Sequence, residues 1–274
     1  MPDCFKIVSI CLVVAGLLFS RFCHAEEYIF SAPPTDDRET SIALYAPIAN
    51  YLSTATGEKF VYKYPQNWSG YISTMQRAGY DFVIDASHFV SWRIENIEHS
   101  PIAGIAQSMT YVVVQLTSAS TSLMNLKGRP VCSSALPNLD ALTLMDQYGS
   151  TWSQPSIKVT TGFENTFSRL ESGECDAAVI PRRVFDRYVR NSPEGKYTVL
   201  FESPELPHLG FSSSSRLDQK VQQEIGLALV SSRSSVALSG LQNKYALEFS
   251  DKPVLADSEM YSGYAYLLAD FWGF

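Results

Sequence analysis

The sequence predicts an α/β protein with two lobes, each a mostly parallel sheet flanked by helices. Short apolar runs of β type alternate with stretches of helical spacing, which is typical of proteins with parallel sheets. The alternation begins again near residue 128, after an apolar run at 110–118 that can cross from one lobe to the other. Two such lobes enclose a cleft at the carboxyl ends of their parallel strands, where α/β proteins commonly bind ligands.

The first lobe is expected to comprise residues 26–110 and to be completed by residues 213–274. Its strands are expected at 28–34, 60–65 and 80–88, and the last of these runs into a polar loop. A helix is expected at 41–57, because apolar residues recur there at helical spacing and Gly57 suits a helix end. Further helices are expected at 68–79, 218–232, 234–248 and 258–271.

The second lobe is expected to comprise residues 111–212. Its strands are expected at 110–118, 130–132, 157–161, 175–181, 197–203 and 209–215. Its helices are expected at 139–145, 162–173 and 182–191, and the second of these ends at Gly173. The last two strands are expected to return the chain toward the first lobe.

Residues 1–25 have the three-part layout of a secretory signal peptide. Lys6 precedes an apolar run of about 13 residues, and the polar stretch that follows ends at Ala25, where we expect cleavage. A membrane-spanning helix needs ~20 apolar residues, so an uncleaved anchor is the weaker alternative. A lipid anchor on Cys23 is disfavoured, because Ser20, Arg21 and Phe22 stand where small and aliphatic residues are wanted. We therefore expect an exported protein that starts at residue 26.

Net charge and cysteine content indicate which partners are excluded and whether a disulfide is expected. The full chain carries a net charge of −7 and the leader +1, so the mature chain is near −8 (−7 minus 1), which argues against nucleic acid and anionic membranes as partners. Only Cys132 and Cys175 remain after the leader, and in an exported chain they are expected to form a disulfide. Such a bond stabilises the fold by about 4 kcal/mol in the chain-entropy model. Two buried free thiols are the alternative.

No catalytic motif is present. The chain has no GxSxG, P-loop, GxGxxG or HExxH pattern, and the mature histidines (88, 99 and 208) have no recognisable triad setting. Asp85 and His88 supply only two of the three or four ligands that a metal site needs. We therefore expect no catalytic residues, no metal, no cofactor and no enzymatic activity.

A candidate anion site lies where the apolar run at 130–132 ends. Ser133, Ser134 and Asn138 stand between this strand and the following helix, whose first backbone N–H groups lack partners within the helix. They are expected to donate hydrogen bonds to an oxyanion. Alternatively, they only cap the helix, since serine and asparagine are favoured caps.

Other candidate ligand-binding residues stand at further strand ends and helix starts. Trp68 and Phe89 can stack on an apolar or planar part of a ligand, although core packing explains them equally well. Glu164 can counter an amine, or simply interact with a helix dipole. The remaining candidates are polar residues at expected strand ends and helix starts: Ser31, Tyr45, Asp85, Ser87, His88 and Asn165.

Several segments in order resemble a known family. They are "APP" (32–34), "YAPIANYLSTATGEKFVYKYP" (45–65), "AGYDFVID" (78–85), "LMNLKGRPVC" (123–132) and "LESGECDAAVIPRRVFDRY" (170–188). Together they resemble the periplasmic substrate-binding proteins of ABC importers with the type II fold. More narrowly, they are similar to a cysteine-containing subgroup of the phosphate/phosphite/phosphonate-binding branch. The likeness covers nearly all of residues 27–272.

The resemblance implies a monomeric periplasmic protein that closes two lobes on a small oxyanion, or on an organic ligand that bears one. It also implies an ABC permease as the membrane partner. The chain departs from the phosphonate binders at the second-lobe helix start, where their Ser-Thr-Ser-Gly is replaced by residues 133–138. Trp68 and Phe89 stand at positions where they have tyrosines, and Glu164-Asn165 replaces their His-Asp or His-Glu pair. The aromatic residues favour an organic ligand, and a periplasmic sensor or accessory module for a membrane kinase or partner enzyme is the alternative function.

Overall fold

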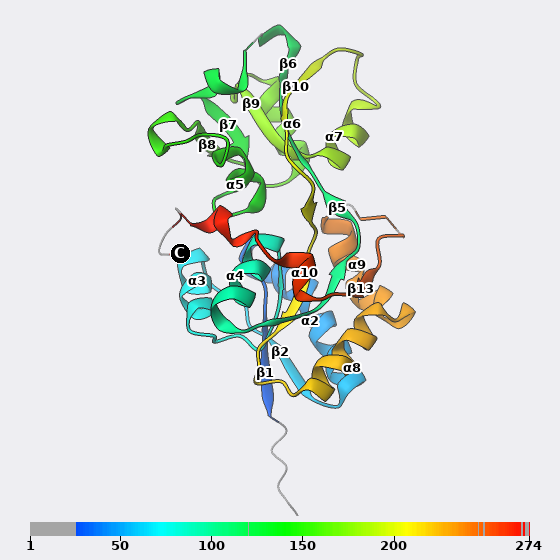
Figure 1. Ribbon diagram of the computed structural model, residues 1–274. Coiled ribbons are helices and arrows are strands. Elements are labelled where there is room, and N and C mark those ends of the chain that lie inside the picture. Colours follow the sequence, from blue (N-terminus) through cyan, green and yellow to red (C-terminus); the bar gives the residue numbers. More distant parts are fainter. Residues whose placement is uncertain (1–25, 120, 246, 249, 270, 272–273) are drawn as a thin grey trace, which may run out of the picture.

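The computed structural model describes residues 26–119, 121–245, 247–248, 250–269, 271 and 274. The expected signal peptide, with Cys4, Cys11 and Cys23, lies outside the described residues. The chain forms two lobes (Figure 1), one around a six-stranded sheet and one around a five-stranded sheet. The expected α/β fold class with two lobes is confirmed. No helix in the described part of the chain is long and apolar enough to cross a membrane.

The first lobe contains the strand order β13-β4-β12-β3-β1-β2. The chain runs through β1 (Glu27–Ser31), α2 (Arg38–Thr56), β2 (Lys59–Tyr62), α3 (Trp68–Gln76), β3 (Phe82–Asp85), α4 (Ser87–Ile97) and β4 (Ser100–Ile105). It later returns through β12 (Gly210–Ser213), α8 (Gln219–Val230), α9 (Ser235–Lys244), β13 (Pro253–Leu255) and α10 (Ser258–Tyr261). β1 pairs with β2 and β3 in parallel, whereas the other ladders are antiparallel. This sheet is therefore mixed rather than mostly parallel.

The second lobe contains the strand order β10-β6-β9-β7-β8. Its elements are β6 (Tyr111–Leu116), β7 (Pro130–Ser133), α5 (Leu139–Met145), β8 (Ser156–Val159), α6 (Phe163–Glu171), β9 (Ala177–Pro181), α7 (Arg182–Val189) and β10 (Tyr197–Glu202). β7 pairs in parallel with β8 and β9, whereas β6 is antiparallel to β9 and β10. Both sheets are thus mixed, with the parallel strands at one side of the sheet and the antiparallel strands at the other.

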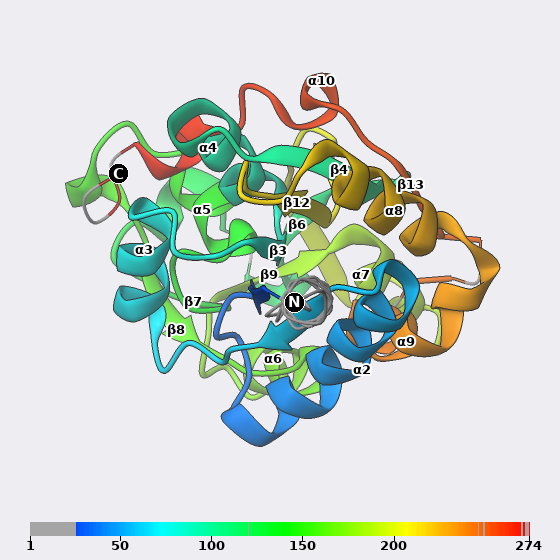
Figure 2. The same cartoon turned by 90° about the horizontal axis from the view of Figure 1, so that it is seen from below.

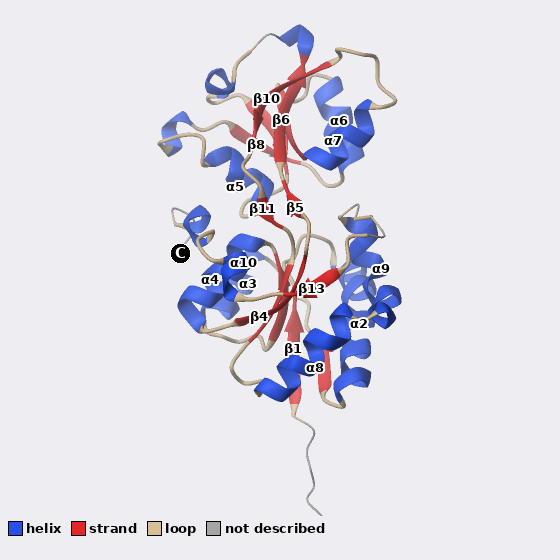
Figure 3. Ribbon diagram, turned by 45° about the vertical axis from the view of Figure 1, so that its right-hand side comes forward, coloured by secondary structure: helices blue, strands red, loops and turns tan. Residues whose placement is uncertain are grey.

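Two short strands join the lobes. β5 (Ser108–Met109) and β11 (Leu206–Pro207) pair in an antiparallel ribbon that lies between the two sheets (Figure 3). The expected crossing strand at 110–118 instead lies within the second sheet as β6. The chain has already returned to the first sheet at Gly210, three residues before the expected start of the completing segment.

The helices of the first lobe cover both faces of its sheet. α2, α8 and α9 pack together on one face, and α3 and α4 lie on the other (Figure 2). α2 begins where the Asp37 carboxylate accepts a hydrogen bond from the Thr40 N–H, and it ends at Gly57 with a φ of +78°. The apolar stripe of α2 thereby faces the sheet, with Tyr45, Ile48 and Leu52 buried.

Two segments differ from the sequence-based expectation. The expected polar loop after β3 is the helix α4, whose buried face carries Ser87, His88 and Arg93 and therefore lacks an apolar pattern. The expected long helix at 258–271 is two short pieces, α10 and the 3₁₀ turn η5 (Ala265–Leu268). Ser262 is extended and Gly263 has a φ of +86°, which ends α10.

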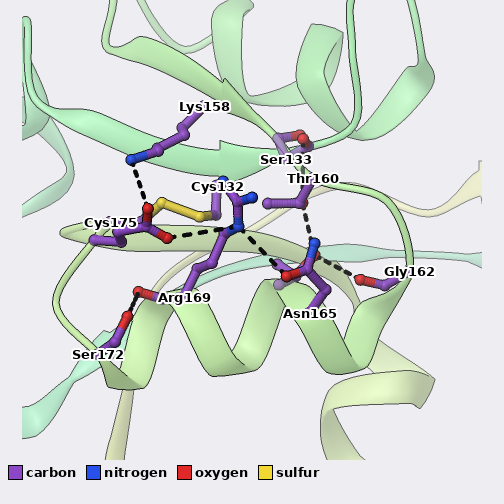
Figure 4. Close-up of a disulfide and its surroundings, with 11 residues drawn as sticks. Cys132, Ser133, Lys158, Thr160, Gly162, Asn165, Arg169, Ser172 and Cys175 are labelled. Carbon is purple, nitrogen blue, oxygen red and sulfur yellow. Dashed lines mark hydrogen bonds and ion pairs between the residues drawn. A yellow bond between two sulfur atoms is a disulfide. The ribbon is translucent and has the colours of Figure 1, made fainter.

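The disulfide between Cys132 and Cys175 is confirmed (Figure 4), with a Cα–Cα distance of 5.6 Å. It joins β7 to the turn between α6 and β9, in the buried core of the second lobe. On the surface above it, Lys158 and Arg169 form ion pairs with Glu174 at 3.1 and 3.5 Å. The cross-link fixes the end of β7 to the turn that follows α6.

Candidate ligand-binding site

A cavity of about 370 Å³ lies between the lobes and is lined by residues of both. The carboxyl ends of the parallel strands contribute much of its wall. Residues 33–36 follow β1, 84–86 end β3, and 159–163 connect β8 to α6. This is the edge of an α/β sheet at which ligands usually bind. Both sheets therefore present their ligand-binding edge to the same space.

Aromatic side chains form one part of the wall. Trp68 is the first residue of α3, and its ring stacks on that of Phe89 with centroids 5.9 Å apart. Tyr111, Phe163 and Tyr245 line the cavity from the second lobe and from α9. Such rings pack well against an apolar or planar group, so the cavity suits a ligand with an organic part.

The Ser133–Ser134 strand end already holds an anion, the side chain of Asp140. The Oδ2 atom of Asp140 accepts hydrogen bonds from Ser133 Oγ and from the Ser134 N–H, both at 3.0 Å. Asp140 is 8% exposed and lines the cavity. Burial raises the pKa of its carboxyl group, and the hydrogen bonds from Ser134 and Ser133 partly oppose that rise. The two donors that were expected to bind an external oxyanion, Ser133 Oγ and the Ser134 N–H, are thus bonded to Asp140 of the same chain.

The N-terminus of α6 is open to the cavity. Gly162 precedes the helix with a φ of +80°, and no side chain caps the helix start. The first backbone N–H groups of a helix have no intrahelical partner. Thr161, Gly162 and Phe163 line the cavity at this point, so the α6 start can receive a negatively charged group.

His88 joins the two lobes beside the cavity. Its Nε2 lies 3.0 Å from the carbonyl oxygen of Pro137, which can only accept a hydrogen bond, so Nε2 carries the proton. Nδ1 is then an acceptor, and it has no hydrogen-bond partner among the described residues. Burial lowers the pKa of His88 to about 3, although the bond to Pro137 opposes this shift. The imidazole is therefore neutral near pH 7.

Asp85 lines the cavity, but its carboxylate is paired with the buried guanidinium of Arg93. Arg93 Nε donates to Asp85 Oδ2 at 2.7 Å, and both side chains are fully buried. Tyr71 donates to the same carboxylate and accepts from Arg93 Nη2 at 2.9 Å. This network leaves little charge on Asp85 for a ligand to interact with.

A second ion pair closes another part of the wall. Lys244, at the end of α9, pairs with Asp36 and donates to Thr35 Oγ1 at 2.6 Å. Within the described chain, the charged side chains of the lining are Asp36, Asp85 and Asp140 together with Lys244. Asp85 and Asp36 are paired with Arg93 and Lys244, so Asp140 is the acid of the described lining without a cationic partner.

Three candidate residues of the first lobe do not line the cavity. Ser31 is buried and donates to the carbonyl oxygen of Lys63 at 2.9 Å. Tyr45 lies in the core with its ring edge against Phe30. Ser87 is buried in the first turn of α4. Their side chains face the lobe interior, although they stand near strand ends.

Three candidates of the second lobe also lie outside the lining. Ser133 is buried behind Asp140, and Glu164 and Asn165 are exposed on the first turn of α6. Asn165 accepts from Arg169 Nε at 3.4 Å. The remaining candidates do line the cavity: Trp68, Asp85, His88, Phe89, Ser134 and Asn138.

Several lining residues were not among the candidates. Asp140 and Thr161 carry a local signal, because each lies within a few residues of a strand end that leads into a helix. Asp36, between β1 and α2, carries the same signal, whereas Lys244 carries none, because α9 reaches the cavity only through the packing of the lobe. In the described part of the chain, no three His, Cys, Asp or Glu residues are grouped so that they could hold a metal ion.

Residues 30–258 match a protein-family model described as "ABC transporter, phosphonate, periplasmic substrate-binding protein". No curated protein matches the sequence. The chain is similar in structure to PhnD1 from Prochlorococcus marinus, solved with methylphosphonate, with a TM-score of 0.66, 13% identity, and coverage of 90% of this chain and 98% of that one. It is also similar to a binding protein component of an ABC phosphonate transporter from Pseudomonas aeruginosa, with a TM-score of 0.61, 12% identity, and coverage of 86% of this chain and 83% of that one. A third similar structure is a Xanthomonas citri protein bound to ATP, with a TM-score of 0.67, 11% identity, and coverage of 89% of this chain and 96% of that one.

Proposed function

The chain belongs to the family of phosphonate periplasmic substrate-binding proteins of ABC transporters, and from this premise we propose that it captures a small organic phosphonate between its lobes. Members of this family bind a small molecule in the periplasm for an ABC permease. The observation that carries the proposal is the cavity of about 370 Å³ lined by both lobes. This volume suits a small ligand.

The anionic head of the ligand is assigned to the start of α6. The backbone N–H groups there lack a side-chain cap, and Thr161 and Gly162 line the cavity. Ser134 and Asn138 remain candidates for secondary contacts on the same lobe. The α6 start supports this assignment better than the Ser133–Ser134 strand end, whose donors serve Asp140.

The organic part of the ligand is assigned to the aromatic wall of Trp68, Phe89 and Tyr111. Trp68 and Phe89 belong to the first lobe and Tyr111 to the second, so a ligand between them contacts both lobes. Contacts made only when both lobes enclose the ligand favour the closed state. Ligand capture by lobe closure follows from this arrangement.

The remaining features of the proposal concern the mature protein. Export through a signal peptide cleaved after Ala25 would release a monomer that starts at residue 26. The two sheets and their linking ribbon support lobes of 26–107 with 208–274, and of 110–205. The Cys132–Cys175 disulfide agrees with an oxidising compartment.

A thermal-shift panel of the purified protein tests the proposal. It contains phosphate, phosphite, sulfate, methylphosphonate, phenylphosphonate and benzoate. A ligand present at 100 times its dissociation constant adds about 2.7 kcal/mol to the free energy of unfolding. We expect several degrees of shift with an organic phosphonate, and a loss of that shift in Trp68→Ala but not in Trp152→Ala, whose ring is 89% exposed. A shift with benzoate alone would contradict the proposal.

A pair of variants tests the assigned position of the anionic head. Phe163 is the first residue of α6, a position at which proline is tolerated and removes only an N–H without an intrahelical partner. Phe163→Ala removes the ring but keeps that N–H, so it is the matched control for Phe163→Pro. We expect phosphonate to bind about tenfold more weakly to Phe163→Pro than to Phe163→Ala, as for the loss of one charge-assisted hydrogen bond. Equal affinities would place the anionic head elsewhere.

A further inference from the structure

The carboxylate of Asp140 has the position and partners of a bound anion. It lies at the end of β7, where Ser133 Oγ and the Ser134 N–H both point to Oδ2 at 3.0 Å. The side chain is 8% exposed, yet it lines the cavity between the lobes. A buried carboxylate persists in a protein only when donors satisfy it, and these donors do so here.

This arrangement excludes a second anion from the same place. An external oxyanion at Ser133 and Ser134 would compete for donors that Asp140 already engages. It would also lie within a few ångströms of a like charge at a site where little water remains to screen the repulsion. Because Asp140 is covalently part of the chain, a free ligand must compete with its high effective concentration at this place.

A second, independent observation concerns His88. It is fully buried, lines the cavity, and presents Nδ1 as an acceptor that has no partner among the described residues. A buried acceptor without a partner is costly. An unsatisfied acceptor of the first lobe, His88 Nδ1, thus lies enclosed beside the cavity that Asp140 of the second lobe and the uncapped start of α6 line.

We propose that Asp140 is a specificity-determining residue, which replaces an external oxyanion at the Ser133–Ser134 strand end and selects ligands that carry a hydrogen-bond donor. The inference rests on the proposed function, because it takes the cavity between the lobes as the ligand site. It predicts that a bare oxyanion binds poorly. A phosphonate with an ammonium group directs that group to Asp140 and its anionic head to α6.

The test measures the affinities of methylphosphonate and aminomethylphosphonate, which differ by one ammonium group, by isothermal titration calorimetry. The proteins are the wild type, Asp140→Asn and Asp146→Asn. Asp146 lies at the opposite end of α5 and does not line the cavity, so its variant has the same change in net charge. We expect the wild type to prefer aminomethylphosphonate about tenfold or more. Asp140→Asn loses this preference because methylphosphonate binds more tightly and the amine more weakly, while Asp146→Asn resembles the wild type.

Three other outcomes separate this inference from the proposed function. If Asp140→Asn unfolds at the wild-type temperature and keeps the wild-type preference, the inference is overturned and the proposed function stands. If the wild type binds neither phosphonate, the proposed function fails, and inorganic phosphate then decides the inference. Asp140→Ser frees the donors of Ser133 and Ser134. Phosphate that binds to this variant but not to the wild type supports the inference about Asp140. Absence of phosphate binding to both proteins overturns it.

Discussion

The buried ion pair behind the cavity makes the strongest prediction about stability. Arg93 and Asp85 are both 0% exposed and lie 2.7 Å apart, and Tyr71 bonds to both. Arg93→Met keeps most of the side-chain volume but leaves Asp85 as a buried carboxylate without its cation. Breaking one partner of such a pair costs about 3–5 kcal/mol. For a chain of this size, that loss lowers the midpoint of thermal unfolding by roughly 6–20 °C.

The assay is urea unfolding followed by tryptophan fluorescence. The double variant Asp85→Asn with Arg93→Met removes both charges, so it is expected to recover a large part of the lost stability. Lys220→Met is the surface control, because Lys220 is 83% exposed and lies 3.8 Å from Glu224, a geometry worth less than about 1 kcal/mol. A loss below about 1 kcal/mol in Arg93→Met, or a double variant no more stable than the single one, would refute the reasoning.

Three further predictions concern the disulfide, a buried histidine and a packed glycine. Replacing Cys132 and Cys175 by alanine should lower the free energy of unfolding by about 4 kcal/mol, measured in urea, and added reductant should then have no further effect. Because burial lowers the pKa of His88 to about 3, the unfolded state binds its proton first, and stability falls as the pH decreases from about 6.5 toward 3. From pH 7 to pH 5, the free energy of unfolding measured in urea should decrease by about 2 kcal/mol less in His88→Gln than in the wild type. An equal decrease in both proteins would contradict a buried neutral histidine. Gly104→Ala should destabilise by about 1–3 kcal/mol, since a Cβ there would lie 2.1 Å from the hydroxyl of Tyr261, whereas Gly149→Ala, with nothing within 4 Å, should not.

Elements with a regular apolar pattern could be predicted from the sequence. α2 has apolar residues at helical spacing and a glycine at its end, and the disulfide follows from the count of cysteines in an exported chain. α4 could not be recognised, because His88, Arg93 and two serines on its buried face look like a loop. Their burial depends on partners such as Asp85 that come from another element. Local pattern does not contain that information.

The candidate site was only partly predictable for a related reason. The candidates that line the cavity stand at or after strand ends that face the other lobe: Trp68, Asp85, His88, Phe89, Ser134 and Asn138. Whether a side chain near a strand end faces the cavity or the core depends on its exact position in the turn, as Ser31 and Ser133 demonstrate. Asp140 is an acid in the first turn of a helix, a common feature that its sequence position alone does not distinguish.

A crystal structure of the protein grown with aminomethylphosphonate tests the central claim most directly. The account predicts closed lobes, with the phosphonate oxygens within hydrogen-bond distance of the N–H groups at Gly162 and Phe163. It also predicts that the Asp140 carboxylate still accepts from Ser133 and Ser134. A phosphonate bound at Ser133 and Ser134 with Asp140 turned away would contradict the account, as would a cavity that remains empty at saturating ligand.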